Sequence, residues 1–207
     1  MRRISEVPQV SFLGWILQPA TSAKDLGVTL DPHLTYDYHI THVVSSCFSK
    51  LYQINRVKKS FIKETLKLLI ASLVFSKMLY CFTVWSITSA GNVSKLQSIQ
   101  NFASQIITNS KKFDHVTPLL RQLNWLPVEQ LQLYKNVIMT YKCLNDLAPQ
   151  YLSDKFIKRS SIHARYTRKR DSFQIPICKT ATGQRTFTYR ATSLWNSLVM
   201  TLRIVPP

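Results

Sequence analysis

The sequence predicts a mainly α fold: a helical bundle with a short N-terminal β-hairpin and a small C-terminal β-hairpin. Three observations lead to this fold class. Apolar residues recur at every third or fourth position through the middle of the chain, which is the spacing of a buried helix face. Short apolar runs bounded by glycine, proline or aspartate occur near the two ends. Hydrophobic residues make up 45% of the 207 residues, so the chain can bury a substantial core.

Residues 1–35 are expected to form a strand-and-turn segment. The run Val10 to Leu17 is apolar around Gly14, and a second strand-like run spans Leu26 to Leu30. The pair Asp31–Pro32 ends the second run as a turn. We therefore expect the two runs to pair as one hairpin.

Residues 36–152 are expected to form the helical bundle. Five helical patterns follow one another in this region, over about 38–56, 62–87, 96–107, 117–123 and 127–144. The first carries an apolar stripe made of Ile40, Val43, Val44, Cys47, Leu51 and Ile54. The last is expected to bury a face made of Leu131, Tyr134, Val137, Ile138, Tyr141 and Leu144.

The second helical pattern is apolar on nearly all sides. From Leu68 to Gly91 it contains one charged residue, Lys77, so its length would allow a membrane span. A central lysine costs about 2.5–3.5 kcal/mol on insertion into a membrane, which favours a buried central helix instead. A basic membrane-associated protein with a span near 68–91 is kept as an alternative, although a membrane is not the partner we expect.

Residues 153–207 are expected to form a basic linker followed by a small C-terminal extension. The strand-like runs Phe173 to Ile177 and Arg185 to Tyr189, joined through Thr182–Gly183, predict the second hairpin. A last helix is expected around Leu194 to Leu198.

The charge balance indicates the kind of partner. Lysine and arginine number 27 against 10 acidic residues, which gives a formal net charge of +17. Such an excess attracts a polyanion, and nucleic acid is the most common one. An anionic membrane surface is the second candidate. We expect the partner to be RNA or DNA, contacted through the phosphate backbone.

The candidate phosphate-binding residues lie mainly in the basic linker. Cations there alternate with Phe156, His163 and Tyr166, and aromatic rings of this kind can stack on exposed bases. The candidate nucleic-acid-binding residues are Lys155, Lys158, Arg159, Arg165, Tyr166, Arg168, Lys169 and Arg170, with a second cluster at Arg56, Lys58 and Lys59. Lys111 and Lys112 form a further basic pair, where capping of a helix end explains the charges about as well.

The sequence predicts no catalytic residue, metal site or cofactor. Nucleotidyl transfer by two metal ions needs clustered carboxylates, but no two of the ten acidic residues are adjacent. Four glycines leave no phosphate-binding loop, and the four cysteines are spaced too widely for a zinc knuckle and read as buried free thiols. His39 and His42 have a spacing that two metal ligands can adopt, but a third ligand would have to come from His33, Asp37 or elsewhere, so no metal site is expected.

Several short motifs occur in a fixed order along the chain. They are Ala23–Asp31 with His39–Ile40, Leu79–Cys81 with Val84–Trp85, Leu96–Asn101, Leu123–Val128, Tyr151–Leu152, Arg165–Arg168 and Leu194–Leu198. In this order they resemble the region just beyond the palm in non-LTR (LINE-type) retrotransposon reverse transcriptases of the jockey or CR1 kind. The resemblance covers about residues 20–198. That family usually continues the last motif with proline, where this chain has Val199.

The resemblance implies a thumb, which is a helical bundle that holds the template–primer duplex, followed by a C-terminal extension. It places residues 1–35 at the palm–thumb junction, with Leu26 to Leu30 in a strand pair near the primer end. The fingers, the palm and its Tyr-x-Asp-Asp motif are not matched, so no polymerase site carries over. We expect a non-catalytic fragment of an RNA-directed DNA polymerase, located inside the cell in the cytoplasm or nucleus, whose further partner is a separate or missing palm domain. The alternative is a decayed transposon remnant without activity.

Overall fold

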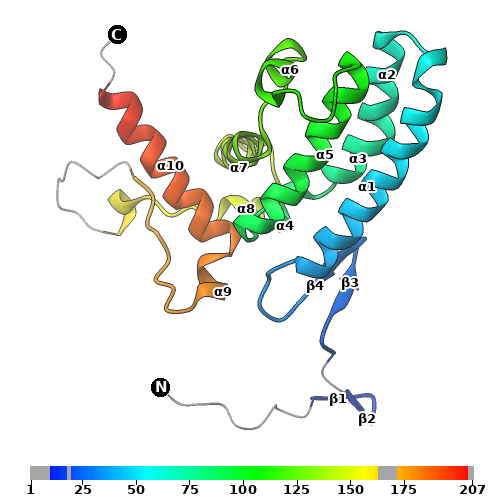
Figure 1. The fold of residues 1–207 in the computed structure, drawn as a ribbon. Helices are drawn as coiled ribbons and strands as arrows, with labels where there is room; N and C mark the ends of the chain where they lie inside the picture. The colour runs from blue at the N-terminus through cyan, green and yellow to red at the C-terminus, as the bar shows by residue number, and fades with distance from the viewer. Residues whose placement is uncertain (1–9, 18–19, 163–171, 205–207) are drawn as a thin grey trace.

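Three helical rods form the body of the protein in the computed structural model, which describes residues 10–17, 20–162 and 172–204 (Figure 1). The first and third rods run in one direction, and the second runs back against both of them. The first is α1 (Asp37–Val57), the second combines α2 (Lys63–Ile70), a π-helical turn (Ala71–Phe75) and α3 (Ser76–Met78), and the third is α5 (Ala90–Thr108). The predicted mainly α class is confirmed.

The apolar stripe of α1 packs into the main core as predicted. Ile40 and Leu51 of α1 are fully buried, and they share one hydrophobic cluster with Ile70, Val74 and Ile99 of the neighbouring rods. Full burial of an aliphatic side chain of this size contributes about 1.5–3 kcal/mol. The main core therefore lies where the three rods meet.

The predicted helix over 62–87 is interrupted, so that part of the prediction is wrong. α3 ends at Met78, Cys81 adopts a left-handed backbone with φ of 50°, and α4 (Phe82–Trp85) begins after it. The turn allows the indole N–H of Trp85 to donate to the carbonyl oxygen of Tyr80 at 2.7 Å while the ring is fully buried. Within the described residues, none of the helices combines the length and the apolar character that crossing a bilayer requires.

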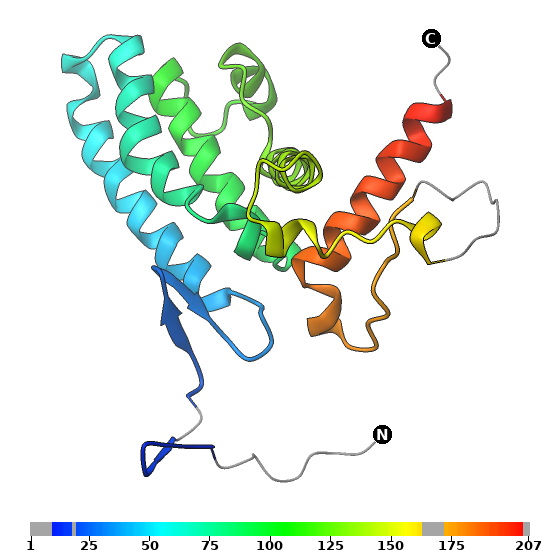
Figure 2. The same cartoon turned by 180° about the vertical axis from the view of Figure 1, so that it is seen from behind.

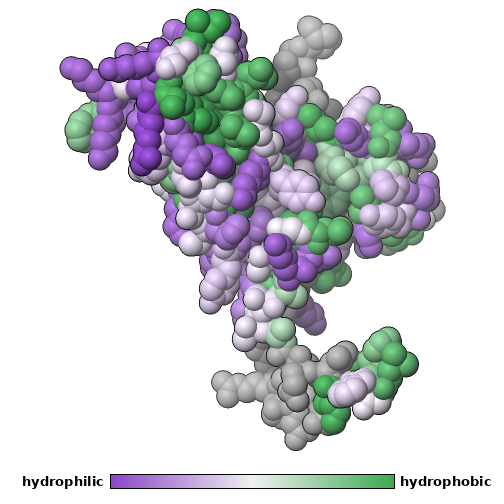
Figure 3. Space-filling view, turned by 90° about the vertical axis from the view of Figure 1, so that its right-hand side faces the viewer, coloured by the Kyte–Doolittle hydropathy of each residue, from purple (hydrophilic) through white to green (hydrophobic). Residues whose placement is uncertain are grey.

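The N-terminal segment contains two hairpins, where the sequence predicted one. β1 (Val10–Phe12) pairs with β2 (Trp15–Leu17), and β3 (Ala23–Asp25) pairs with β4 (Val28–Leu30). Each hairpin turns through a Leu–Gly pair in which both residues have positive φ, as two-residue hairpin loops require. The first apolar run therefore supplies both strands of its own hairpin, whereas the second run supplies the turn and β4 and pairs with Ala23–Asp25 before it. Figure 3 shows apolar side chains on the surface of the outer, β1–β2 hairpin.

Two further helices lie against the bundle. They are α6 (Val116–Gln122), which begins close to the predicted position, and α7 (Val128–Leu144), which is seen almost end-on in Figure 1 and therefore crosses the rods. The predicted buried face of α7 is wrong in part: Leu131 and Leu144 pack against the two hydrophobic clusters, but Tyr134 and Tyr141 are about half exposed. The helix instead buries Asn136 and Thr140, which lie beside α4 and α10.

The predicted C-terminal hairpin is absent from the described residues. After α8 (Gln150–Ser153) and a 3-10 turn (Arg159–Ser161), the chain forms α9 (Ala181–Gln184) and α10 (Phe187–Ile204). The Thr180 side chain accepts a hydrogen bond from the Gly183 N–H, which caps α9 and favours helix over strand. Phe173 pairs with Lys158 instead, in a single antiparallel bridge.

A second, smaller apolar cluster holds the C-terminal part to α7. It contains Cys143, Phe156, Phe173 and Ala191, with Trp195 packed against it. The rings of Phe156 and Phe173 meet edge to face, with centroids 5.7 Å apart. Figure 2 shows from behind how α10 runs past α7 on the side away from α1. The last helix expected around Leu194 to Leu198 is confirmed and is longer than predicted.

Candidate nucleic-acid interface

The motifs of the N-terminal hairpin and of the chain near α4 contact each other directly. The hydroxyl of Tyr80 donates to the carbonyl oxygen of Leu26 at 3.0 Å. The Tyr80 ring covers Gly27, where an added Cβ would lie 3.5 Å from the ring edge. The motif residues at this point therefore fix the β3–β4 hairpin on the bundle.

Two other motifs form the joint between α5 and α7. The side-chain oxygen of Gln97 accepts from the Val128 N–H at 2.8 Å, which satisfies a backbone donor at the start of α7. The Gln100 amide donates to the Leu126 carbonyl oxygen at 2.8 Å. The Gln97 amide N–H also donates to the side-chain oxygen of Asn101 at 2.8 Å, which fixes the orientation of the Gln97 amide.

The last motif anchors the basic linker. The Asn196 side chain accepts from the N–H of Phe173 and donates to its carbonyl oxygen, each at 2.9 Å. On the other edge of Phe173, the Gln174 N–H donates to the Ile157 carbonyl oxygen at 2.8 Å, and the Arg159 N–H donates to the Ser172 carbonyl oxygen at 3.0 Å. The points where the chain enters and leaves residues 160–171 are therefore adjacent.

A turn before α1 is built around one carboxylate. Asp31 accepts from the N–H groups of His33 and Thr35 at 3.0 Å each and of Tyr36 at 2.6 Å. Burial of Asp31 acts to raise its pKa, but these hydrogen bonds outweigh it, and the pKa is lowered from its ordinary value. The Arg185 guanidinium donates to the His33 carbonyl oxygen at 2.6 Å, so the end of α9 is attached to the same turn.

Arg190 is a half-buried cation that the sequence analysis missed. Its guanidinium donates to the carbonyl oxygen of Thr83 at 3.0 Å and lies 3.4 Å from the side-chain oxygen of Asn136. Burial lowers the pKa of Arg190 to about 10, while the nearby Tyr36 acts in the opposite direction. Burial likewise raises the pKa of Tyr36. An isolated arginine in a helical pattern gives no signal of this role, because its partners come from three distant segments.

His39 is a core residue and shows no feature of a metal ligand. It is buried, its ring meets that of Trp85 edge to face at 5.2 Å, and its Nδ1 accepts from the Thr29 N–H at 3.4 Å. Burial, and then the nearby His42, lower the pKa of His39, which favours the neutral ring. The described part of the chain contains no group of three or more residues able to hold a metal ion.

The structure describes only some of the candidate residues of the basic linker. Lys155, Lys158 and Arg159 are exposed. Lys158 forms the antiparallel bridge with Phe173, and Arg159 directly follows it. Five candidates lie outside the described residues: Arg165, Tyr166, Arg168, Lys169 and Arg170.

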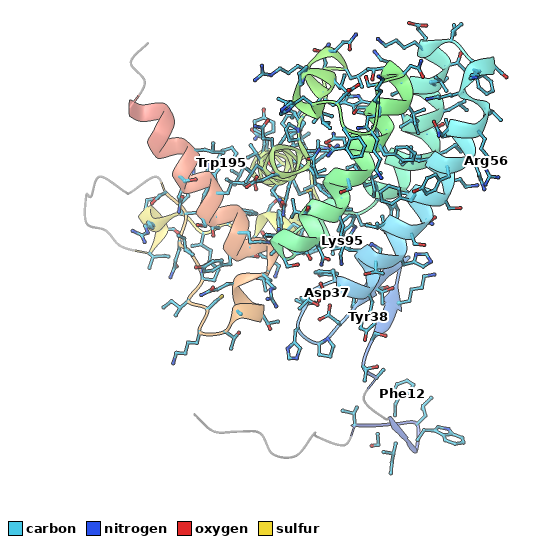
Figure 4. The ribbon with its side chains drawn as sticks, viewed as in Figure 1. Phe12, Asp37, Tyr38, Arg56, Lys95 and Trp195 are labelled. Atoms are coloured by element: carbon cyan, nitrogen blue, oxygen red, sulfur yellow. The ribbon has the colours of Figure 1, made fainter. Side chains whose placement is uncertain are left out.

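The second predicted cluster lies where α1 turns into α2. Arg56 is exposed on the outer side of α1 (Figure 4). Lys58 and Lys59 line a small pocket of about 260 Å³ together with Lys63. Lys58 also lines a groove with Lys112, so the structure brings these two sequence clusters together. The 155–159 segment lies on the other side of the molecule in Figures 1 and 2.

Comparison with known proteins identifies a related segment. The chain is 31% identical over 121 residues to the "Probable RNA-directed DNA polymerase from transposon BS" of Drosophila melanogaster. The match covers 56% of this chain and 13% of that polymerase. No family model and no solved structure matches the chain. The match confirms the resemblance to a segment of a retrotransposon reverse transcriptase.

Proposed function

We propose that this chain, related to a segment of a transposon RNA-directed DNA polymerase, is a thumb-like part of a LINE-type enzyme that holds template–primer nucleic acid. The observation that carries the proposal is the excess of positive charge, with 27 lysines and arginines against 10 acidic residues. It occurs in a chain whose relative is an RNA-directed DNA polymerase. In this proposal residues 1–35 form the palm–thumb junction and 36–152 the thumb-like bundle. Residues 153–207 add the basic linker and extension.

Phosphate contacts are assigned to the exposed cations. Lys155, Lys158 and Arg159 stand at the anchored base of the linker, and the proposal extends to the arginines and lysines at 165–170. Arginine and lysine bound to phosphates release counterions, which gives affinity without sequence preference. A polymerase that moves along its template needs binding of this kind.

The proposed role is non-catalytic. Two-metal transfer requires carboxylates that meet at one place. Asp31 is engaged in the turn before α1, and Asp37 accepts from the Asn92 amide at 2.5 Å. Asp114 accepts from the Lys111 N–H at 2.7 Å, and Asp154 accepts from Gln150 at 2.8 Å. These four acids lie in turns or at helix ends, where each is engaged in a local hydrogen bond, so we assign the chemistry to another part of the polymerase.

The test is a salt series on binding of the full chain to DNA duplex and RNA–DNA hybrid. The logarithm of the binding constant should fall linearly with the logarithm of the salt concentration, by about 0.9 for each phosphate contact on B-DNA. Replacing Arg165, Arg168 and Arg170 together by alanine should make the slope shallower. Affinity that does not change with salt would overturn the proposal, whereas an unchanged slope in the variant would move the contacts to the 56–59 or 111–112 clusters.

A further inference from the structure

A groove runs between α1 and α5 on the face that includes the α1–α2 turn. Its volume is about 640 Å³. The two helices lie side by side, so each contributes residues spaced by three or four positions to one wall. Phe48, Tyr52 and Asn55 come from α1, Lys58 from the 3-10 turn directly after it, and Ser98, Asn101, Phe102 and Gln105 from α5.

The floor of the groove is aromatic. The rings of Phe48 and Phe102 are stacked, with centroids 6.1 Å apart and planes inclined by 26°. The Tyr52 ring lies 5.3 Å from that of Phe102 and is inclined by 54°. Tyr52 is 56% exposed, although it packs on two other rings. A tyrosine held by its neighbours with one side open offers a fixed surface on which a flat ligand can stack.

Polar groups with unused hydrogen-bonding capacity stand beside the rings. The half-buried Asn55 side chain has no hydrogen-bond partner among the described residues. Asn101 uses its side-chain oxygen to accept from Gln97, which leaves its amide N–H groups available. An amide can both donate and accept, and it therefore matches the edges of nucleobases.

The charge around the groove favours an anionic ligand. Lys58 and Lys112 line it, and none of the described aspartates or glutamates does. Lys59 and Lys63 line the neighbouring pocket, which shares Lys58 with the groove. The cations therefore continue from the aromatic floor toward the start of α2, where a phosphate backbone could follow them.

We propose that this groove binds unpaired bases of single-stranded nucleic acid, with one base stacked against Tyr52 and with Lys58 and Lys112 contacting the adjoining phosphates. Stacking requires a base that is free of its pairing partner, and it tolerates any sequence because every base has an aromatic face. The inference rests on the proposed nucleic-acid function and adds a second contact site, separate from the basic linker.

The test uses the full chain and single-stranded DNA and RNA oligonucleotides that carry 2-aminopurine, whose fluorescence falls when the base stacks. The wild-type chain should quench this fluorescence on binding. Tyr52→Leu keeps an apolar side chain but removes the ring, and it should weaken binding by roughly 5- to 150-fold and abolish the quenching. The salt slope should stay unchanged, because stacking releases no counterions. Lys58→Ala combined with Lys112→Ala should make the slope shallower.

Tyr38→Leu is the matched control, since Tyr38 is a 75% exposed tyrosine of α1 that lies outside the groove (Figure 4). It should bind and quench like the wild type. Asn55→Leu provides a second groove variant that leaves the rings in place, and it should also weaken binding. Thermal unfolding of each variant checks that the fold is kept. Equal binding by the wild type and both groove variants would overturn the groove site alone, whereas a wild-type chain that binds no nucleic acid would overturn the proposed function as well.

Discussion

The guanidinium of Arg190 in α10 donates a hydrogen bond to the carbonyl oxygen of Thr83 in α4, at 3.0 Å across 107 positions of sequence. It also approaches Asn136 of α7, so one side chain connects three helices. The C-terminal part of the chain is thus attached to the bundle by a half-buried cation as well as by the apolar cluster around Phe173.

Removal of this cation should destabilise the protein. Arg190→Ala would leave the Thr83 carbonyl oxygen and the Asn136 amide without a charged donor, and it should lower the free energy of unfolding by about 2–4 kcal/mol. Urea denaturation checks this value. Arg121→Ala, which removes an exposed arginine of α6, is the control and should change the stability by less than about 0.5 kcal/mol. Equal effects of the two substitutions would contradict the assigned role of Arg190.

The turn at Asp31 should make stability depend on pH in acid. Its folded-state pKa lies below the ordinary value of 3.8, so the carboxylate stabilises the fold fully above that value and loses its effect as pH falls through the folded-state pKa. Asp31→Ala should cost about 1–2 kcal/mol at pH 7, because three backbone N–H groups of the turn lose their charged acceptor. The difference from wild type should shrink as the pH falls below about 4. A difference that stays constant down to pH 2 would contradict this explanation.

The joint between α5 and α7 depends on the amides of two motifs. Gln97→Ala removes the acceptor for the Val128 N–H and should reduce the free energy of unfolding by about 1–2 kcal/mol. Ser94→Ala, at an exposed position of the same helix, is the matched control. Hydrogen exchange at the Val128 amide provides a local readout, and it should accelerate in the first variant only.

The cysteines should differ in reactivity. Burial raises the pKa of Cys47 to about 11, and Cys47 and Cys143 are both buried, whereas Cys81 and Cys178 are half-buried. Because the thiolate is the reactive form, an alkylating reagent at pH 8 should modify Cys81 and Cys178 well before the two buried thiols. Mass spectrometry of peptides after a time course measures the order. Early modification of Cys47 would be inconsistent with its burial in the core.

The sequence predicted those elements whose pattern is local. The stripe of α1 is readable because Ile40, Cys47 and Leu51 repeat at helical spacing and all face one core. The buried face of α7 was mispredicted because Asn136 and Thr140 are polar. Asn136 lies within hydrogen-bonding distance of Arg190 and Ser86, which are about fifty residues away along the chain. Hydrogen bonds between distant segments leave no periodic signal in a sequence.

The candidate site was also predicted only in part from the sequence. Charge alone identified Lys58 and Lys112, but their common groove depends on how α1 and α5 pack. Phe48 and Tyr52 carried a visible signal, since they stand four residues apart, each one position beyond a core residue. Their partner Phe102 comes from another helix, so the aromatic floor is a product of tertiary structure.

The clasp that Asn196 forms on Phe173 has a consequence for how the protein tolerates cleavage. The segments 157–159 and 172–174 are hydrogen-bonded to each other around a single bridge, and Asn196 and the aromatic cluster hold the second segment from its other side. Covalent continuity between the two segments is therefore unnecessary for their attachment. A protease that cuts once between them would yield two polypeptides that migrate separately under denaturing conditions but elute together from a sizing column.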